Sequence, residues 1–285
     1  MNETVRIAIQ KSGRLNEKSI NLLTNCGIKV NAGGKLMSAS DNFPLEVFYL
    51  RDDDIPQYVA EGVADIGIVG ENEYLEKAEN VEILNRPGFS RCRLSLAVKR
   101  EVDFDSISWF EGKKIATSYP VILRDFLKKS GVNAEIETIS GSVEIAPGIG
   151  LAEGIFDIVS TGSTLLANGL KEVQVVLKSE AVIIANPTLT AEKREIVDQL
   201  LFRIEATKAA RQNKYILLNA PDNSLDRILK LLPGMRSPTV VPLASKGWSS
   251  VHSVIKEDDF WNVIDQLKEA GAEGILVCPI EKMIV

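Results

Sequence analysis

Residues 152–176 read AEGIFDIVSTGSTLLANGLKEVQVV. The pattern predicts a helix end at 152–154, an apolar strand over 155–159, and a second helix that reaches Asn168 and stops at Gly169. Between the strand and the second helix lies a loop of hydroxyl and glycine residues: Ser160, Thr161, Gly162, Ser163 and Thr164. Free N–H groups at a helix start, together with hydroxyls, suit an anion such as phosphate. The alternative is a turn in which Ser160 or Thr161 only caps the helix.

Residues 60–70, AEGVADIGIVG, repeat the pattern of residues 152–162, AEGIFDIVSTG. An ungapped alignment matches Asp65 with Asp157 and Gly70 with Gly162. The repeat predicts two similar α/β lobes whose loops face one cleft. The second copy carries hydroxyl residues where the first is apolar, so the phosphate site is expected in the second lobe. Chance similarity between two α/β units is the alternative.

Composition narrows the class of protein. The chain has 285 residues, 45% of them hydrophobic and 25% charged, which is typical of a globular protein of two or three domains. A net charge of −6 argues against general nucleic-acid binding. No apolar run is long enough to span a membrane, and the start MNETVRIAIQ lacks the features of a signal peptide. We therefore expect a cytoplasmic protein with no membrane or nucleic-acid partner.

Cysteine and histidine usage excludes several kinds of site. Cys26, Cys92 and Cys278 are widely spaced and odd in number, which argues against a disulfide framework or a cysteine zinc site. The single histidine, His252, removes most histidine-dependent triads and all multi-histidine metal sites. Its alternating surroundings predict a partly exposed strand residue. No metal site built from protein side chains is expected.

Charged residues follow the predicted strands at their carboxyl ends, where open α/β sheets bind ligands. A strand over 5–9 is followed by Lys11, Gly13 and Arg14. Asn16 is then expected to cap a helix that ends near residue 25. Two cations at this edge suit a phosphate-bearing partner. Solvated surface charges are the alternative.

Three further strands carry charged groups at an end. Residues 45–50 lead to Arg51, and one of the aspartates after it is expected to cap a helix that reaches residue 61. Arg51 is therefore a better candidate for ligand binding than the acids. A strand at 65–69 leads to Gly70 and Glu71. Another, over 91–98, begins with Arg91 and crosses towards a second lobe near residue 99.

The remaining pattern predicts the domain organisation. Lobe I is expected over 1–98 and 180–210, and lobe II over 99–179. In lobe II, Glu144 lies in a loop that leads to a helix before the phosphate loop, and surface exposure of Glu144 is the alternative to ligand contact. Residues 211–285 predict the order β-α-β-β-α-β of a ferredoxin-like module. Such an appended module is more often regulatory or oligomerising than catalytic.

At this point the chain resembles one family over essentially its whole length: ATP phosphoribosyltransferase of the long form, the first enzyme of histidine biosynthesis. The resemblance rests on the motifs KSGRL (11–15), ADIGIVG (64–70), SVEIAP (142–147), DIVSTG (157–162), ANGL (167–170), SPT (237–239) and PIEKM (279–283). It implies an α/β fold of two periplasmic-binding-protein-like lobes with a C-terminal ferredoxin-like (ACT-like) α+β regulatory domain.

The resemblance also implies an activity. It is the Mg²⁺-dependent transfer of the 5-phosphoribosyl group from phosphoribosyl pyrophosphate (PRPP) to N1 of ATP, with release of pyrophosphate. Feedback inhibition by L-histidine and assembly into homo-oligomers, dimers or hexamers, are further implications. A solute-binding protein and a non-catalytic amino-acid sensor are the competing interpretations. The first is disfavoured by the missing signal peptide, and the second by the presence of the loop hydroxyls.

Site residues follow from the same resemblance. The residues expected to bind PRPP are Glu144, Asp157, Ser160, Thr161, Gly162, Ser163 and Thr164, with Glu144 and Asp157 near the ribose hydroxyls. Those expected near ATP are Lys11, Gly13, Arg14, Arg51, Asp65, Gly70, Glu71 and Arg91. Lys11, Arg14 and Asp157 are the catalytic candidates, and Asn219, Met235 and Thr239 the candidates for histidine. Many phosphoribosyltransferases carry two adjacent acids before the loop, whereas Phe156 precedes Asp157 here.

Overall fold

The computed structural model describes residues 3–30, 36–232 and 234–284. The chain forms two compact units, Met1–Asp198 and Gln199–Val285, and their boundary lies within helix α6 (Ala191–Gln212). The first unit contains two mixed sheets and the second contains one antiparallel sheet. No helix in the described part of the chain is long and apolar enough to cross a membrane.

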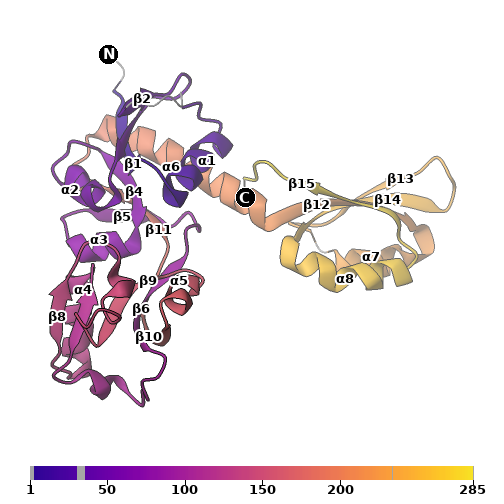
Figure 1. Cartoon of the computed structure of the whole chain (residues 1–285). Coiled ribbons are helices and arrows are strands. Elements are labelled where there is room, and N and C mark those ends of the chain that lie inside the picture. The colour runs from indigo at the N-terminus through magenta and orange to yellow at the C-terminus, as the bar shows by residue number, and fades with distance from the viewer. Residues whose placement is uncertain (1–2, 31–35, 233, 285) are drawn as a thin grey trace. The chain divides into compact units, whose positions relative to one another are not determined.

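The first sheet has the strand order β2-β3-β1-β4-β11-β5 (Figure 1). Its strands are β1 (Val5–Gln10), β2 (Met37–Ala39), β3 (Leu45–Leu50), β4 (Ile66–Gly70), β5 (Glu82–Asn85) and β11 (Ala181–Ala185). Strand β1 is parallel to both β3 and β4, so their carboxyl ends share one edge of the sheet. Each of the three leads at that edge towards a helix: α1 (Arg14–Asn25), α2 (Ile55–Ala60, after the 3-10 turn Asp52–Asp54) and α3 (Glu71–Lys77).

Apolar residues fix this sheet against its helices. Every residue of β11 is buried, which is expected of a central strand. Helix α2 packs so closely on β4 that a Cβ atom at Gly67 would lie 2.6 Å from Cγ2 of Ile55. A larger residue at Gly67 would therefore push α2 away from the sheet.

The second sheet has the order β10-β6-β9-β7-β8. Its strands are β6 (Cys92–Lys99), β7 (Lys114–Thr117), β8 (Glu135–Thr138), β9 (Gly154–Val159) and β10 (Leu170–Ser179). With them are the helices α4 (Pro120–Ser130) and α5 (Ser163–Ala167) and the 3-10 turns Ile107–Phe110 and Val143–Ile145. Helix α4 buries Leu123 and Leu127 in a core that contains Phe110 and Phe156. It stops at Gly131, whose φ of 68° is readily adopted by glycine.

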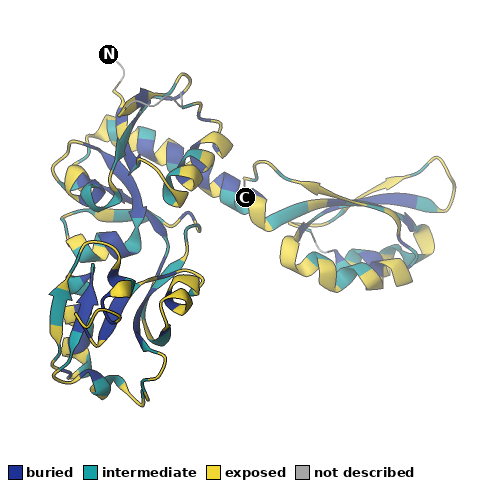
Figure 2. Ribbon diagram, in the orientation of Figure 1, coloured by how far each residue is buried: buried dark blue, intermediate teal, exposed yellow. Residues whose placement is uncertain are grey.

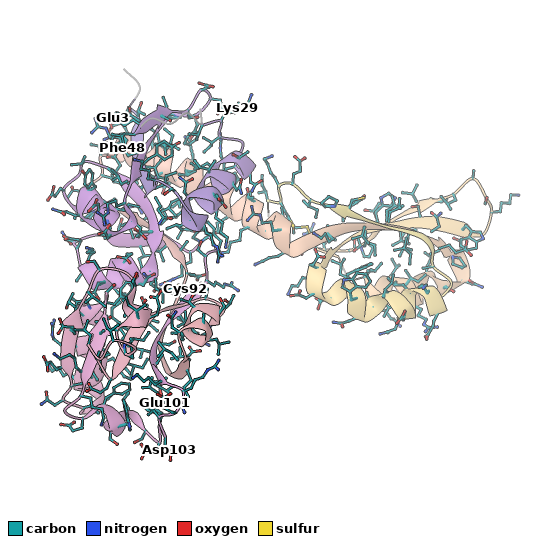
Figure 3. The ribbon with its side chains drawn as sticks, viewed as in Figure 1. Glu3, Lys29, Phe48, Cys92, Glu101 and Asp103 are labelled. Atoms are coloured by element: carbon teal, nitrogen blue, oxygen red, sulfur yellow. The ribbon has the colours of Figure 1, made fainter. Side chains whose placement is uncertain are left out.

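Strand β6 corrects the expected division of the lobes. The division at residues 98 and 99 assigned this segment to the first lobe, but β6 pairs with β9 and β10 of the second sheet. The chain therefore crosses between the sheets at residues 86–91 and returns at Glu180, which leads into β11. Cys92, at the start of β6, lies where the two lobes meet, and Glu101 and Asp103 lie beyond the other end of this strand (Figure 3).

The two repeated segments do not fold identically. Strand β9 covers positions that align with 62–67, whereas β4 covers 66–70. Asp65 therefore precedes its strand, while the aligned Asp157 lies near the carboxyl end of β9. The helix expected to end at 152–154 is also absent, because residues 143–153 form a 3-10 turn followed by turns and bends. The repeat predicted two lobes, but its two copies place their aspartates at different ends of a strand.

The second unit has the predicted ferredoxin-like order. Strands β12 (Asn213–Pro221), β13 (Thr239–Pro242), β14 (Trp248–Lys256) and β15 (Glu273–Pro279) form a sheet of order β13-β14-β12-β15. Helices α7 (Leu225–Leu231) and α8 (Glu257–Glu269) cover one face of it, where β12 and β14 contribute buried residues (Figure 2). No helix among the described residues of this unit covers the opposite face.

Candidate functional site

The hydroxyl-rich loop follows β9 directly. It lines a cavity of about 210 Å³ together with Glu144, Asp157 and Arg14, so residues of both lobes contribute to one site. Gly162 turns the chain with a φ of 82°, and Thr161 Oγ1 lies 3.0 Å from Ser163 Oγ. Helix α5 is only five residues long, so its dipole is small and the loop's hydroxyl and N–H groups are the main donors. The loop thus brings several hydrogen-bond donors to one cavity, and none of its side chains is bulky.

Two acids lie in the same cavity. Burial, with a smaller contribution from the nearby charge of Glu144, raises the pKa of Asp157 to about 6, and the Ile158 N–H, which donates to Asp157 Oδ1 at 2.8 Å, opposes the shift. Glu144 lies in the 3-10 turn Val143–Ile145 and is half-buried, not fully exposed. Asp157 can therefore switch between donor and acceptor near neutral pH.

The loop after β1 supplies cations from the first lobe. Lys11 and Arg14 are exposed, and neither has a carboxylate partner among the described residues. Helix α1 begins at Arg14 because Gly13 takes a φ of 93° and turns the chain into the helix. Asn16 does not cap it, contrary to expectation, but donates from Nδ2 to the Gln10 carbonyl at 2.6 Å. Of the two cations, Arg14 lines the loop cavity.

The other predicted charges lie in two further cavities. Arg51 lines one of about 540 Å³ and pairs with Asp53 at 3.3 Å. Glu71 and Arg91 line another of about 480 Å³, where Glu71 binds Arg86 at 2.6 Å and Arg91 lies 3.6 Å from Glu180. Gly70 precedes α3 at the edge of this cavity. No aspartate side chain caps α2.

Asp65 lies away from this edge of the sheet. It precedes β4 at its amino end, where it is buried, accepts the Arg6 N–H at 2.7 Å and pairs with Lys193 of α6 at 2.9 Å. Asp65 is therefore not among the groups at the carboxyl ends of these strands, and its expected position near ATP stays a prediction. Asp65 instead ties β1 and β4 to α6.

A buried polar contact between the lobes was not predicted. Tyr119, before α4, donates its hydroxyl to Glu73 of α3 at 2.9 Å, and Asn72 Nδ2 donates to the same carboxylate oxygen at 3.1 Å. Burial raises the pKa of both Glu73 and Tyr119. Glu76 accepts the N–H groups of Val121 and Ile122 at the start of α4. The contacts of Glu73 with Tyr119 and of Glu76 with α4 join residues more than 40 positions apart in the chain (46 for Glu73 and Tyr119), so no local sequence pattern predicts them.

Arg93 and Glu172 are a second set that the sequence did not single out. Arg93 Nε and Nη2 each donate to Glu172 at 2.6 Å, and Arg93 Nη1 donates to the Ser160 carbonyl at 3.1 Å. Ser95 Oγ donates to Glu172 at 2.6 Å. The carbonyl of Ser160, the first residue of the loop, thus accepts a hydrogen bond from Arg93, and Arg93 is fixed by its two hydrogen bonds to Glu172.

In the second unit, two of the three expected histidine-binding residues share the helix-free face of the sheet. Asn219 pairs with Ser250 and Thr239 with His252, and residues 250 and 252 project to the same side of β14. Met235, which precedes β13, is 55% exposed. His252 is half-buried, as predicted, and its Nδ1 lies 2.6 Å from Tyr215 Oη.

The described residues include no group of three or more His, Cys, Asp and Glu side chains that could hold a metal ion. Any metal at the loop cavity would therefore depend on ligands from substrate as well as from Asp157 and Glu144. Those two carboxylates have no ion-pair partner among the described residues.

Comparison with known proteins gives consistent similarities. A family model described as ATP phosphoribosyltransferase matches residues 51–206, and one described as HisG, C-terminal domain, matches residues 210–282. A protein from Bacteroides thetaiotaomicron named ATP phosphoribosyltransferase is 60% identical over 282 residues, 99% of this chain and 100% of that protein. One of the same name from Cytophaga hutchinsonii is 58% identical over 285 residues, with both chains fully covered.

Two solved structures add to this. A chain of the ATP phosphoribosyl transferase (HisG:HisZ) complex from Thermotoga maritima has 29% identity and a TM-score of 0.61, with 71% of this chain and 99% of that chain covered. The substrate-binding protein of an amino acid ABC transporter has 12% identity and a TM-score of 0.50, with 73% and 94% covered. The second similarity is one of fold alone and supports the two-lobed architecture.

Proposed function

Because this chain belongs to the ATP phosphoribosyltransferase family, we propose that it transfers the 5-phosphoribosyl group of PRPP to N1 of ATP and releases pyrophosphate, as the first step of L-histidine biosynthesis. The observation that carries this proposal is the loop cavity. It combines hydroxyl donors and two carboxylates from one lobe with Arg14 from the other.

The loop binds the 5-phosphate of PRPP. Ser160, Thr161, Ser163 and Thr164 offer hydroxyls and N–H groups, and Gly162 lets the backbone turn around the anion. The hydroxyls of Thr161 and Ser163 lie 3.0 Å apart, and each can rotate from this contact to donate to a phosphate oxygen. The loop contains no charged side chain, so it can bind phosphate through hydroxyl and N–H donors without displacing an acidic group.

Asp157 and Glu144 contact the ribose. As carboxylates they accept hydrogen bonds from the ribose hydroxyls, which orients C1 of the sugar towards the nucleophile. A ribosyl transfer of this kind passes through an oxocarbenium-like transition state, in which negative charge near the ring is favourable. Adenine N1 carries a lone pair, so no base is needed to deprotonate it.

Cations neutralise the polyphosphates. Arg14 in the loop cavity and Lys11 beside it lack acidic partners among the described residues, so their charge is available to pyrophosphate or ATP. The second substrate would lie along two further cavities of the first unit. One is lined by Arg51 and the other by Glu71 and Arg91, with Gly70 next to Glu71 in the chain. The chain's main contribution to the rate is to orient two polyanions and stabilise the leaving group.

The proposed reaction uses Mg²⁺, which the substrates' phosphates can carry into the site. Asp157 and Glu144 fit this requirement, since two neighbouring carboxylates can supply oxygen ligands, and the charge of Glu144 already raises the pKa of Asp157. When bound, Mg²⁺ would neutralise charge on the departing pyrophosphate.

We also infer that L-histidine inhibits the enzyme through the second unit and that the chain forms homo-oligomers. Asn219 and Thr239 place polar groups on the helix-free face of the ferredoxin-like sheet, and Met235 adds an apolar contact beside it. The similarity to the Thermotoga maritima chain covers 99% of that chain but only 71% of this one. This chain therefore carries a further unit that the other chain lacks.

The phosphate assignment is tested with the double variant Thr161→Val/Ser163→Ala. Losing two hydroxyl donors to a charged group should weaken PRPP binding roughly 100-fold, as measured by isothermal titration calorimetry. Ser106→Ala/Ser108→Ala is a matched control, because it removes another pair of adjacent hydroxyls, 2.7 Å apart, in the same lobe. Equal PRPP affinity in the loop variant and the control would refute the assignment.

A further inference from the structure

Arg93 connects the sheet of the second lobe to the first peptide of the phosphate loop. It lies on β6, and two of its nitrogens hold both oxygens of Glu172 on β10 at 2.6 Å. The third nitrogen, Nη1, donates to the Ser160 carbonyl at 3.1 Å. Because a guanidinium is a rigid plane, fixing two nitrogens on a carboxylate also fixes the direction of the third.

Glu172 is itself held in place. Ser95 Oγ donates to it at 2.6 Å, so its Oε1 accepts from two partners. The pairing of β10 with β6 is irregular between Glu172 and Gln174, and such irregularities redirect side chains from the regular strand direction. The side chains of Arg93 and Glu172 are 31% and 26% exposed, so the pair is partly shielded from solvent. Hydrogen bonds from Arg93 lower the pKa of Glu172, which keeps it ionised.

The contact to Ser160 determines the orientation of the next N–H group. The peptide bond is planar and trans, so the Ser160 C=O and the Thr161 N–H point in opposite directions. Ser160 is also the one residue shared by the cavity that Arg93 lines and the loop cavity, among the described lining residues. With its C=O turned to Arg93, the peptide presents the Thr161 N–H on the other side, where this N–H has no acceptor among the described residues.

We propose that Arg93, held by Glu172, which Ser95 in turn holds, is a positioning residue that locks the Ser160–Thr161 peptide with its N–H turned towards the 5-phosphate of PRPP. This inference rests on the proposed function of the loop. Without Arg93 the peptide can flip, and the Ser160 carbonyl would then present negative charge to the phosphate in place of a donor.

The test compares Arg93→Lys and Arg93→Met with the wild type. Lysine keeps the charge but cannot bind Glu172 with two nitrogens while reaching Ser160 with a third. The probes are D-ribose 5-phosphate, which carries the 5-phosphate without pyrophosphate, and PRPP. Arg93→Lys should bind both roughly tenfold more weakly, by calorimetry, and Arg93→Met at least as weakly. In steady-state assays KM for PRPP should rise while KM for ATP stays unchanged.

Two further variants separate positioning from charge and from folding. Lys178→Met removes one positive charge from the same cavity, at the position that pairs with Arg93 across β10 and β6, and should bind both probes within about twofold of wild type. Glu172→Gln keeps Arg93 but weakens the hydrogen bonds that fix it. This variant should therefore reduce the affinity for both probes, but by less than Arg93→Met does. Melting temperatures identify any variant that fails to fold, and the remaining variants then decide the question.

The outcomes are distinct. Arg93→Lys binding ribose 5-phosphate as tightly as wild type would overturn the positioning role while the phosphate loop stands. Weaker PRPP binding with unchanged ribose 5-phosphate binding would also overturn it, because Arg93 would then act on pyrophosphate. A wild-type protein that binds neither probe would refute the proposed function itself.

Discussion

Asp157 is the residue whose protonation most directly controls the site. Burial and the charge of Glu144 raise its pKa to about 6, whereas an exposed aspartate lies near 3.8. The carboxylate form accepts hydrogen bonds from the ribose through both of its oxygens, whereas protonation turns one of those oxygens into a donor. The ligand-binding form of the site therefore exists mainly above about pH 6.

PRPP affinity should accordingly fall as the pH is lowered through about 6. Calorimetric titrations of wild type between about pH 5 and pH 8 measure this. Asp157→Asn should bind PRPP more weakly than wild type at pH 8, and its affinity should change less with pH. Any pH dependence that remains in this variant reports the titration of the ligand's own phosphates. Wild type and Asp157→Asn with superimposable pH profiles would contradict the role of Asp157.

The same shift affects the stability of the ligand-free protein in the opposite direction. Because the folded pKa lies above the unfolded one, the stabilising contribution of Asp157 is fully present below about pH 3.8 and is lost as the pH rises through about 6. Ligand-free Asp157→Asn should therefore melt at a higher temperature than wild type at pH 8. The raised stability with lowered affinity distinguishes a site residue from a structural one.

At the scale of elements, α3 joins the two lobes. This helix has seven residues and follows β4 of the first sheet, yet Glu73 and Glu76 contact residues at the start of α4 in the second lobe. Helix α4 has no side-chain cap of its own, and the Glu76 carboxylate replaces it by accepting the N–H groups of Val121 and Ile122 at 2.9 and 3.0 Å.

Glu76→Ala should lower the free energy of unfolding by about 1 kcal/mol, as loss of a helix cap does. Urea denaturation followed by circular dichroism measures the change. The control is Asp125→Ala, which removes an exposed carboxylate of α4 paired with Lys129 and should cost less than about 0.5 kcal/mol. Equal losses in both variants would mean that Glu76 is an ordinary surface charge.

The elements themselves were largely predictable, because each carries a local signal. Neighbouring residues are enough to predict the alternation of β3 and β14, and also the boundaries of α4 at Pro120 and Gly131. Contacts such as that of Arg93 with Glu172 cannot be predicted in this way, since 79 residues separate them and they meet only through the pairing of β10 with β6, which is irregular between Glu172 and Gln174. The two copies of the repeat show the same limit: they align Asp65 with Asp157, but strand β4 begins four positions later than β9 in that alignment (66 against 62, the position aligned with Gly154).

At the scale of the whole molecule, two compact units divide the proposed tasks. The first unit holds the loop cavity, and the second is a ferredoxin-like module with one face free of its own helices. The order of the second unit was predictable in large part because β12 and β14 alternate between buried and partly exposed positions. Its ligand was expected from the family resemblance alone.

Asn219→Ala should weaken L-histidine binding roughly tenfold, because the ligand loses an amide partner on the sheet face. Calorimetry with L-histidine measures the effect. Gln266→Ala lies on α8, which covers the opposite face, and should leave histidine binding unchanged. Unaltered binding in Asn219→Ala would move the histidine site away from this face.

The most direct measurement is a spectrophotometric assay of N1-phosphoribosyl-ATP formation by the purified full chain. ATP, PRPP, Mg²⁺ and a pyrophosphatase are supplied, with and without L-histidine. Product should form only when both substrates are present, and L-histidine should suppress its formation. Folded protein that binds PRPP or another anion in the loop cavity but forms no product would contradict the enzymatic role and favour a binding protein.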